Sequence, residues 1–183
     1  MECIQELRKE HEAIELVLNV LESVSARMQR GEVVATADLD AVMEFLSVFA
    51  DRCHHGKEEG FLFPAMEKAG IPRQGGPIGV MLHEHEQGRA LIAKLFEAVG
   101  QIKAGQNSVS AGFASAATDY AALLKQHISK ENNILFPMAE ARLSPSLDAE
   151  LSKSFGELEH EQIGPGKHEQ FHATLDRLRQ QYL

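Results

Sequence analysis

The sequence contains no tryptophan and only two cysteines, Cys3 and Cys53, among its 183 residues. Two cysteines cannot build a disulfide-rich scaffold, so the fold must rest on an ordinary hydrophobic core. Basic residues are also scarce: 18 lysines and arginines face 27 aspartates and glutamates, which gives a net charge of −9. This balance argues against sequence-independent binding to nucleic acid or to an anionic membrane, because both require a basic surface.

Long hydrophobic runs are missing as well. The apolar runs are a few residues long, far short of the ~20 residues that span a bilayer. The N-terminal segment MECIQELRKEHE is charged and lacks the apolar region of a signal peptide. We therefore expect a cytoplasmic protein without a nucleic-acid or membrane partner. Histidine, in contrast, is well represented with nine residues, and their positions carry the rest of the argument.

The chain is patterned for helices. Apolar residues recur in steps of three and four from Ile4 to Met28 and again from Ile78 to Ile102, as on one face of a packed helix. A second helix is expected to begin near Thr36 or Asp38, either of which could cap it. Pro64 lacks an amide proton and should interrupt that helix near Gly60.

Proline and serine residues divide the rest of the chain. Pro77 suits the first turn of a third helix, and Ser108 could cap a fourth. Ser144-Pro145 should start a short helix that ends near His160, and residues 167–182 are expected to form a final amphipathic helix.

An internal repeat lies on top of this pattern. Adding 74 to the apolar positions of the first helix gives those of the third, and His11 becomes His85. With an offset of 73, the segment from His54 to Pro64 matches the segment from His127 to Pro137. The repeat predicts an all-α, up-down-up-down four-helix bundle with a pseudo-two-fold axis over residues 1–143. Residues 144–183 would form a helical extension packed on the same domain.

The repeat also selects the residues that carry chemistry: His11, His54, Glu58, His85, His127 and Glu131. Each His-x-x-x-Glu pair projects from one helix face about one turn apart. Buried imidazoles need partners, and buried carboxylates are costly unless paired or bound to metal. Such a set favours a dinuclear metal site in the bundle core over a group of hydrogen-bonded core histidines. Nitrogen and oxygen donors suit iron, with manganese or zinc as alternatives.

Other candidates lack the symmetry of the repeat. His55 and Glu59 share the i, i+4 spacing but map to Ile128 and Asn132, so we expect them at the surface or behind the ligands. His83 lies about 200° around the helix from His85 and should be exposed.

For the other residues that could take part in chemistry, we expect mainly packing or solvent exposure. We expect Cys53 to be a packed, reduced thiol, and Tyr120 to pack in the core unless it hydrogen-bonds near the metals. Asp51 and Arg89 are expected in solvent, with a place behind the ligands as the alternative. His168 and His172 share one helix face, which makes a second metal site an alternative there.

These residues resemble the hemerythrin-like family, in its HHE cation-binding branch, over about residues 4–140. The resemblance rests on the pattern His11, His54-x-x-x-Glu58, His85, His127-x-x-x-Glu131. It implies a four-helix bundle with a non-haem di-iron centre, two iron ions bridged by oxo or hydroxo. It also implies that these six residues are the iron ligands and that Glu58 and Glu131 bridge the two irons.

One departure from the oxygen-carrying members affects the expected function. They have a further histidine one turn from the third-helix ligand, where this sequence has Met81 and Arg89, and an aspartate in the fourth helix. With that histidine missing, both irons would keep an open position. We therefore expect a redox protein that binds or reacts with peroxide, nitric oxide or dioxygen, using an electron donor that the sequence does not identify.

The alternative is a non-catalytic module for oxygen or iron binding, sensing, or iron donation in cluster repair. The sequence leaves open whether the protein is an enzyme and what its oligomeric state is. A metal-free structural bundle is disfavoured by the polar residues on the apolar faces.

Overall fold

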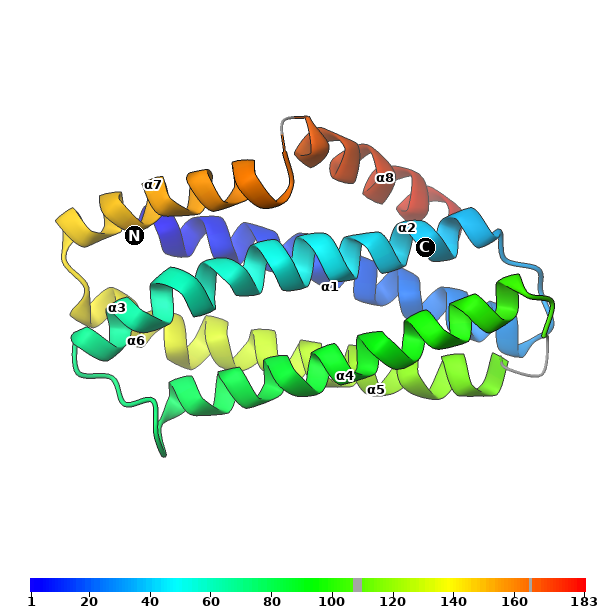
Figure 1. Cartoon of the computed structure of the whole chain (residues 1–183), viewed down its shortest axis with the longest axis horizontal. Helices are drawn as coiled ribbons and strands as arrows, with labels where there is room; N and C mark the ends of the chain where they lie inside the picture. Colours follow the sequence, from blue (N-terminus) through cyan, green and yellow to red (C-terminus); the bar gives the residue numbers. More distant parts are fainter. Residues whose placement is uncertain (107–109, 165) are drawn as a thin grey trace.

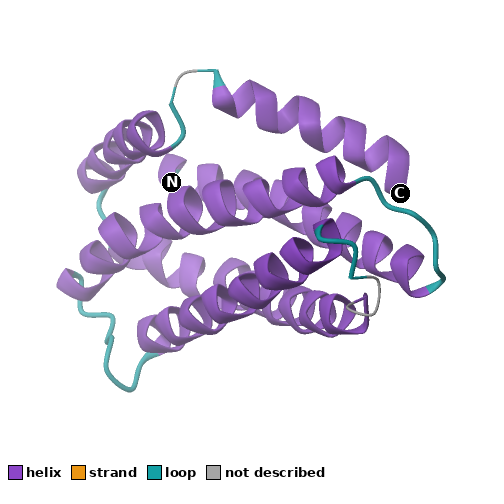
Figure 2. Ribbon diagram, turned by 45° about the vertical axis from the view of Figure 1, so that its right-hand side comes forward, coloured by secondary structure: helices purple, strands orange, loops and turns teal. Residues whose placement is uncertain are grey.

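The computed structural model describes residues 1–106, 110–164 and 166–183, without the side chains of Ser110 and His168. This part of the chain is helical and contains no strand (Figure 2). The elements are α1 (Glu2–Gln29), α2 (Thr36–Glu44), η1 (Phe45–His55), η2 (Glu58–Leu62), α3 (Phe63–Lys68), α4 (Pro77–Lys103), α5 (Ser110–Lys130), η4 (Glu131–Leu135), α6 (Phe136–Arg142), α7 (Pro145–Gln162) and α8 (Lys167–Tyr182). The all-α prediction is confirmed for these residues.

The long helices close a ring around a common interior. Helix α5 packs against both α1 and α4, and the continuous stretch of α2 and η1 contacts α1 and α4. In Figure 1, α4 and α5 run side by side along one edge, while α7 and α8 lie along the opposite edge. Both C-terminal helices pack on α1, and α7 also contacts η1 and η2.

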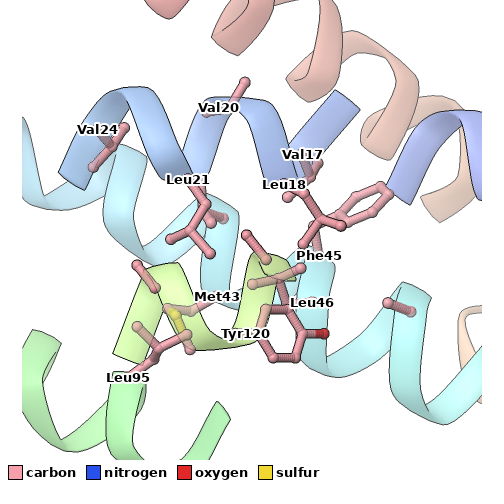
Figure 3. Packing of buried hydrophobic residues seen from close by; sticks show 14 of the residues in the cluster. Val17, Leu18, Val20, Leu21, Val24, Met43, Phe45, Leu46, Leu95 and Tyr120 are labelled. Atoms are coloured by element: carbon pink, nitrogen blue, oxygen red, sulfur yellow. The ribbon is translucent and has the colours of Figure 1, made fainter. Parts of the chain in front are cut away.

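The interior contains two separate clusters of buried apolar residues. The larger one joins the C-terminal half of α1 to α2, η1, α4, α5 and α8, and Figure 3 shows Leu18 and Leu21 packing toward Met43, Leu46 and Tyr120. The smaller cluster joins the N-terminal end of α1 to α3, α6 and α7. The layer between the two clusters is polar, and the apolar residues on either side seal it from water.

The prolines shift the helical hydrogen bonding without breaking the helices. The π-helical segments η2 (Glu58–Leu62) and η4 (Glu131–Leu135) are related by the 73-residue offset. They directly precede Pro64 and Pro137, which lack the amide proton that an α-helical turn would use there. The interruption expected near Gly60 is therefore a widened π turn, a feature common at functional sites.

The helix predicted to start at Ser144-Pro145 is confirmed, whereas the cap predicted for α2 is wrong. Ser144 caps α7 by accepting a hydrogen bond from the amide of Leu147 at 3.3 Å. Helix α2 begins at Thr36 as expected, but its N-cap is Ala35, and neither Thr36 nor Asp38 supplies a cap hydrogen bond. Asp38 instead accepts hydrogen bonds from α8. Ser108 lies outside the described residues.

None of the helices described is long and apolar enough to cross a membrane.

Candidate metal centre

The polar layer contains all six residues selected by the repeat. Each is buried, with at most 2% of its surface exposed. They come from six different elements: His11 from α1, His54 from η1, Glu58 from η2, His85 from α4, His127 from α5 and Glu131 from η4. The π-helical segments η2 and η4 thus present the two carboxylates, and the residues predicted from the sequence do meet in space.

Glu131 lies between two histidines from different halves of the repeat. Its Oε2 is 3.2 Å from Nε2 of His11, and its Oε1 is 3.3 Å from Nε2 of His127. The Nε2 atoms of His127 and His85 are 3.0 Å apart. Both nitrogens could therefore reach the same metal ion.

Glu58 has the equivalent place on the other side. Its Oε1 is 3.7 Å from Nε2 of His54, and its Oε2 is 3.5 Å from Nε2 of His85. Two groups of four residues result, each with ligand atoms within 4.8 Å of one another: His11, His54, Glu58 and Glu131, and His55, Glu58, His85 and His127. Glu58 belongs to both groups, as a carboxylate between two metal positions would.

In each of the four histidines, Nδ1 points away from the centre, and its hydrogen-bond partner fixes the tautomer of the ring. Every Nδ1 meets an oxygen that can only accept: His11 meets Asn132 (3.0 Å), His54 meets Glu10 (2.7 Å), His85 meets Glu59 (2.7 Å) and His127 meets Glu84 (3.0 Å). Each Nδ1 therefore donates its proton outward and leaves the Nε2 lone pair facing the centre, as in metal-ligating histidines. These partners also obey the repeat, because Glu10 matches Glu84 and Glu59 matches Asn132.

The two central carboxylates differ in protonation. Burial, followed by the charge of Glu131, raises the pKa of Glu58 well above its ordinary value. Burial also disfavours the charged form of Glu131, but His127 and His11 outweigh it and hold the pKa well below the usual range. Without a bound cation, the pair therefore carries a single negative charge, because two close buried carboxylates do not both ionise.

The histidines respond to their surroundings in opposite directions. Burial lowers the pKa of His54 to about 4, although its hydrogen bond to Glu10 opposes the shift. Burial would also lower the pKa of His127, but Glu131 and Glu84 outweigh it and raise that pKa to about 9. The metal-free protein therefore favours a second proton on His127, carried by Nε2, which a bound cation would have to displace.

The decisive observation is a concentration of unsatisfied polar atoms. Among the described residues, eight buried side-chain nitrogens and oxygens lack a hydrogen-bond partner, and six of them belong to His11, His55, Glu58 and Glu131. Such atoms are costly to bury and are rare in folded proteins. Their convergence, with lone pairs facing inward, fits a pair of metal ions.

The chain belongs to the hemerythrin HHE cation-binding domain family. That family's domain matches residues 3–139, which include all six predicted ligands. The resemblance drawn from the sequence is therefore confirmed, and a metal-binding function follows at the level of the family.

Similar proteins extend the comparison. An uncharacterized protein of Mycobacterium tuberculosis is 21% identical over 95% of this chain and 66% of its own length. The iron-sulfur cluster repair protein DnrN of Neisseria gonorrhoeae is 38% identical over 45% of this chain and 54% of its own length. The cluster repair protein YtfE of Musicola paradisiaca is 39% identical over 47% of this chain and 40% of its own length. The chain thus spans about two fifths to two thirds of these relatives.

The repeat placed His55 either at the surface or behind the ligands, and the structure excludes the surface. Only 3% of this residue is exposed, and its ring stacks on His85 with centroids 3.9 Å apart. The repeat could not find it, because its counterpart is Ile128. The signal available was the His54-His55 doublet one turn before Glu58 and Glu59; both histidines are buried at the end of the π-helical segment η1.

The remaining polar residues near the centre support the ligands or lie outside it. Asp51 and Arg89 stand behind the histidines: Asp51 accepts from His55, and Arg89 pairs with Asp51 and with Glu59. His83 is exposed, as expected. Tyr120 is buried, and its hydroxyl has no hydrogen-bond partner. For His168 the side chain is not described, so the alternative of a metal site with His172 stays untested.

A third acidic group next to the centre already surrounds a cation, the ammonium group of Lys57. The carboxylates of Glu6, Glu10 and Glu159 surround Nζ of the fully buried Lys57 at 2.7, 2.5 and 3.0 Å. A surface cavity of about 610 Å³ between α1 and the C-terminal helices includes Glu10 in its lining. Glu10 therefore contacts both this cavity and His54, whose Nδ1 proton it accepts.

Proposed function

We propose that this chain is a non-haem di-iron protein of the hemerythrin type, whose metal ligands are His11, His54, Glu58, His85, His127 and Glu131. The convergence of inward-facing Nε2 lone pairs and unsatisfied carboxylate oxygens carries the proposal. The donor set of imidazoles and carboxylates suits iron, with manganese and zinc as alternatives. Glu58 and Glu131, each between two histidines, would bridge the ions together with an oxo or hydroxo group.

The architecture that goes with this function is an up-down-up-down four-helix bundle. Helices α1 and α4, with the stretches from α2 to α3 and from α5 to α6, would be its four members, and residues 1–143 its extent. The repeat offsets of 74 and 73 residues support this topology. Residues 144–183 would be an extension of the same domain, which agrees with the packing of α7 and α8 on α1.

The residues around the centre would bind and shield a small ligand. Leu7 and Met81 lie on one side of the polar layer, Ile14 and Leu124 on the other, and each is at most 3% exposed. Glu10, Glu84, Glu59 and Asn132 keep each imidazole in its ligating tautomer. Bound iron would act as a Lewis acid and electron source toward peroxide, nitric oxide or dioxygen.

A second candidate is a non-catalytic role in oxygen or iron binding, sensing, or iron donation. Its support is the likeness to proteins named for iron-sulfur cluster repair, which covers about half of this chain. Reaction and donation differ in the fate of the iron, which stays bound in the first and leaves in the second. A cytoplasmic location and a separate electron donor belong to the same proposal.

Metal analysis is the first test of the di-iron centre. Protein purified without oxygen and loaded with ferrous iron should hold about two irons per chain and develop oxo-bridge absorption in air. Less than about one iron per chain, with no such band, would refute the proposal. Glu131→Ala should lose more iron than Glu59→Ala, because Glu59 reaches only the outer nitrogen of His85. Equal losses would contradict the ligand assignment.

The two candidate functions are separated by following the iron during turnover. Peroxide or nitric oxide should be consumed with the iron retained if the protein is reactive. A stable, reversible oxygen adduct without consumption would favour the carrier. Transfer of iron to a cluster-free acceptor protein would favour donation.

A further inference from the structure

The two halves of the metal centre are nearly identical in their polar groups. The repeat pairs His11 with His85, His54 with His127 and Glu58 with Glu131, and it also pairs their outer partners. One buried pair breaks the symmetry: His55 has Ile128 as its counterpart, and both are at most 3% exposed. A side chain that offers a metal ligand in one half is thus replaced by a hydrocarbon in the other.

His55 has the same arrangement as the four histidines in the proposed ligand set. Its Nδ1 lies 3.3 Å from a carboxylate oxygen of Asp51, which can only accept. Its Nε2 is buried and has no hydrogen-bond partner. This side chain offers a ligand atom within 4.8 Å of atoms of Glu58, His85 and His127. A nitrogen with a free lone pair, buried among three further donors, has no structural use unless a cation shares it.

We propose that His55 is a fifth imidazole ligand and joins His85 and His127 at one metal position. This inference rests on the proposed di-iron function. The His85 position then has three imidazoles, whereas the position of His11 and His54 has two, because Ile128 offers no donor. The centre becomes unequal: the first ion is saturated, and an external ligand binds only at the second. The expectation of two open irons, drawn from the absence of a histidine beside His85, is then replaced by one open iron.

The stacking of His55 on His85 indicates that the His55 ring must rotate to reach the metal ion. Their rings are inclined by only 16° with centroids 3.9 Å apart, and two stacked rings cannot both direct lone pairs at one ion. His55 must therefore turn out of the stack when metal binds. The Nδ1 contact to Asp51, at 3.3 Å, is the longest of the five outer contacts. The weak hold leaves the ring free to make this turn.

Mössbauer spectroscopy of the ⁵⁷Fe-loaded protein tests the inequality without any assay of activity. The wild type should give two quadrupole doublets of equal area, one for each coordination environment, and should bind one azide per iron pair. In His55→Ile, which copies the residue of the other half, the doublets should merge and the azide stoichiometry should double. His83→Ala, at an exposed histidine, is the matched control and should leave both readouts unchanged.

A second variant, His55→Ala, distinguishes metal binding by His55 from a packing role. In His55→Ala, added imidazole should restore the wild-type doublets and the one-azide stoichiometry, which a packing role would not produce. A wild type with two irons in a single doublet would overturn the role of His55 and leave the di-iron function standing. His55→Ile with the wild-type doublets and one bound azide would overturn that role in the same way. Failure of the wild type to hold two irons would overturn both proposals.

Discussion

The ammonium nitrogen of Lys57 lies 3.0 Å from a carboxylate oxygen of Glu159, which links the C-terminal extension to the metal centre. Lys57 is fully buried and also contacts Glu10, which in turn accepts the Nδ1 proton of His54. The sequence of contacts runs from α7 through Lys57 and Glu10 to a proposed metal ligand. The extension is therefore part of the support of the site, a role that its sequence alone did not reveal.

Replacing Lys57 should be severely destabilising. Lys57→Met removes the cation that compensates the buried carboxylate of Glu10, and breaking a buried ion pair costs about 3–5 kcal/mol. We expect a loss of this size in the free energy of unfolding, measured by urea denaturation. Lys153→Met is the control, because Lys153 is 79% exposed and pairs only loosely with Glu157. The double variant Lys57→Met with Glu10→Gln should recover much of the loss, and failure to recover would contradict the charge argument.

The two central glutamates should respond differently to neutralisation in the metal-free protein. Burial and Glu131 raise the pKa of Glu58 well above its ordinary value, which favours the uncharged form that Glu58→Gln mimics. We expect Glu58→Gln to change the stability of the metal-free protein by less than about 1 kcal/mol, or to increase it. Glu131→Gln removes the charged partner of His127 and His11 and should cost about 3 kcal/mol or more.

The measurement for this pair is urea unfolding in the presence of a chelator, followed by an iron count after loading. Both variants should fail to hold two irons, although only Glu131→Gln is unstable without metal. Equal destabilisation of the two variants would show that the charge is not held by Glu131.

The parts of the site that follow from periodicity could be predicted, and the parts that depend on tertiary packing could not. Residues separated by 73 or 74 positions share an environment, so the repeat identified the six central residues. Pro64 predicted an interruption near Gly60, but not its π-helical form. His55 breaks the repeat and needed the folded chain to show its burial. Asp38 is a residue type that often caps helices, but its carboxylate instead accepts hydrogen bonds from residues of α8, which lie 139 or more positions away in the sequence.

The buried thiols should be inert in the native protein. Burial raises the pKa of both Cys3 and Cys53 to about 12, so the reactive thiolate is scarce at pH 8. We expect Ellman's reagent to react with the folded protein roughly a thousand-fold more slowly than with an ordinary thiol. In concentrated urea both cysteines should react at the normal rate. Rapid labelling of either cysteine in the folded state would contradict the burial shown here.

The docking of α8 should depend on pH through Asp38. This carboxylate accepts hydrogen bonds from Arg177, Gln181 and Tyr182 at 2.6, 3.0 and 2.7 Å. Burial alone would raise its pKa, but these hydrogen bonds outweigh it and lower the pKa. Because the folded-state pKa is depressed, the stabilisation is fully present above the unfolded value of about 3.9 and is lost as the pH falls through the folded value.

The variant Asp38→Asn removes this ionised acceptor and should cost about 1–3 kcal/mol of unfolding free energy at pH 7. The difference between wild type and variant should begin to shrink near pH 3.9 and approach zero once the pH is below the depressed folded-state pKa, because the wild-type carboxyl is then protonated in the folded protein as well. Asp40→Asn, at an exposed aspartate paired with Lys103, should change stability by less than about 1 kcal/mol. If the difference in unfolding free energy between wild type and Asp38→Asn stayed the same at the lowest pH measured, its cause would be the packing of the side chain and not its charge.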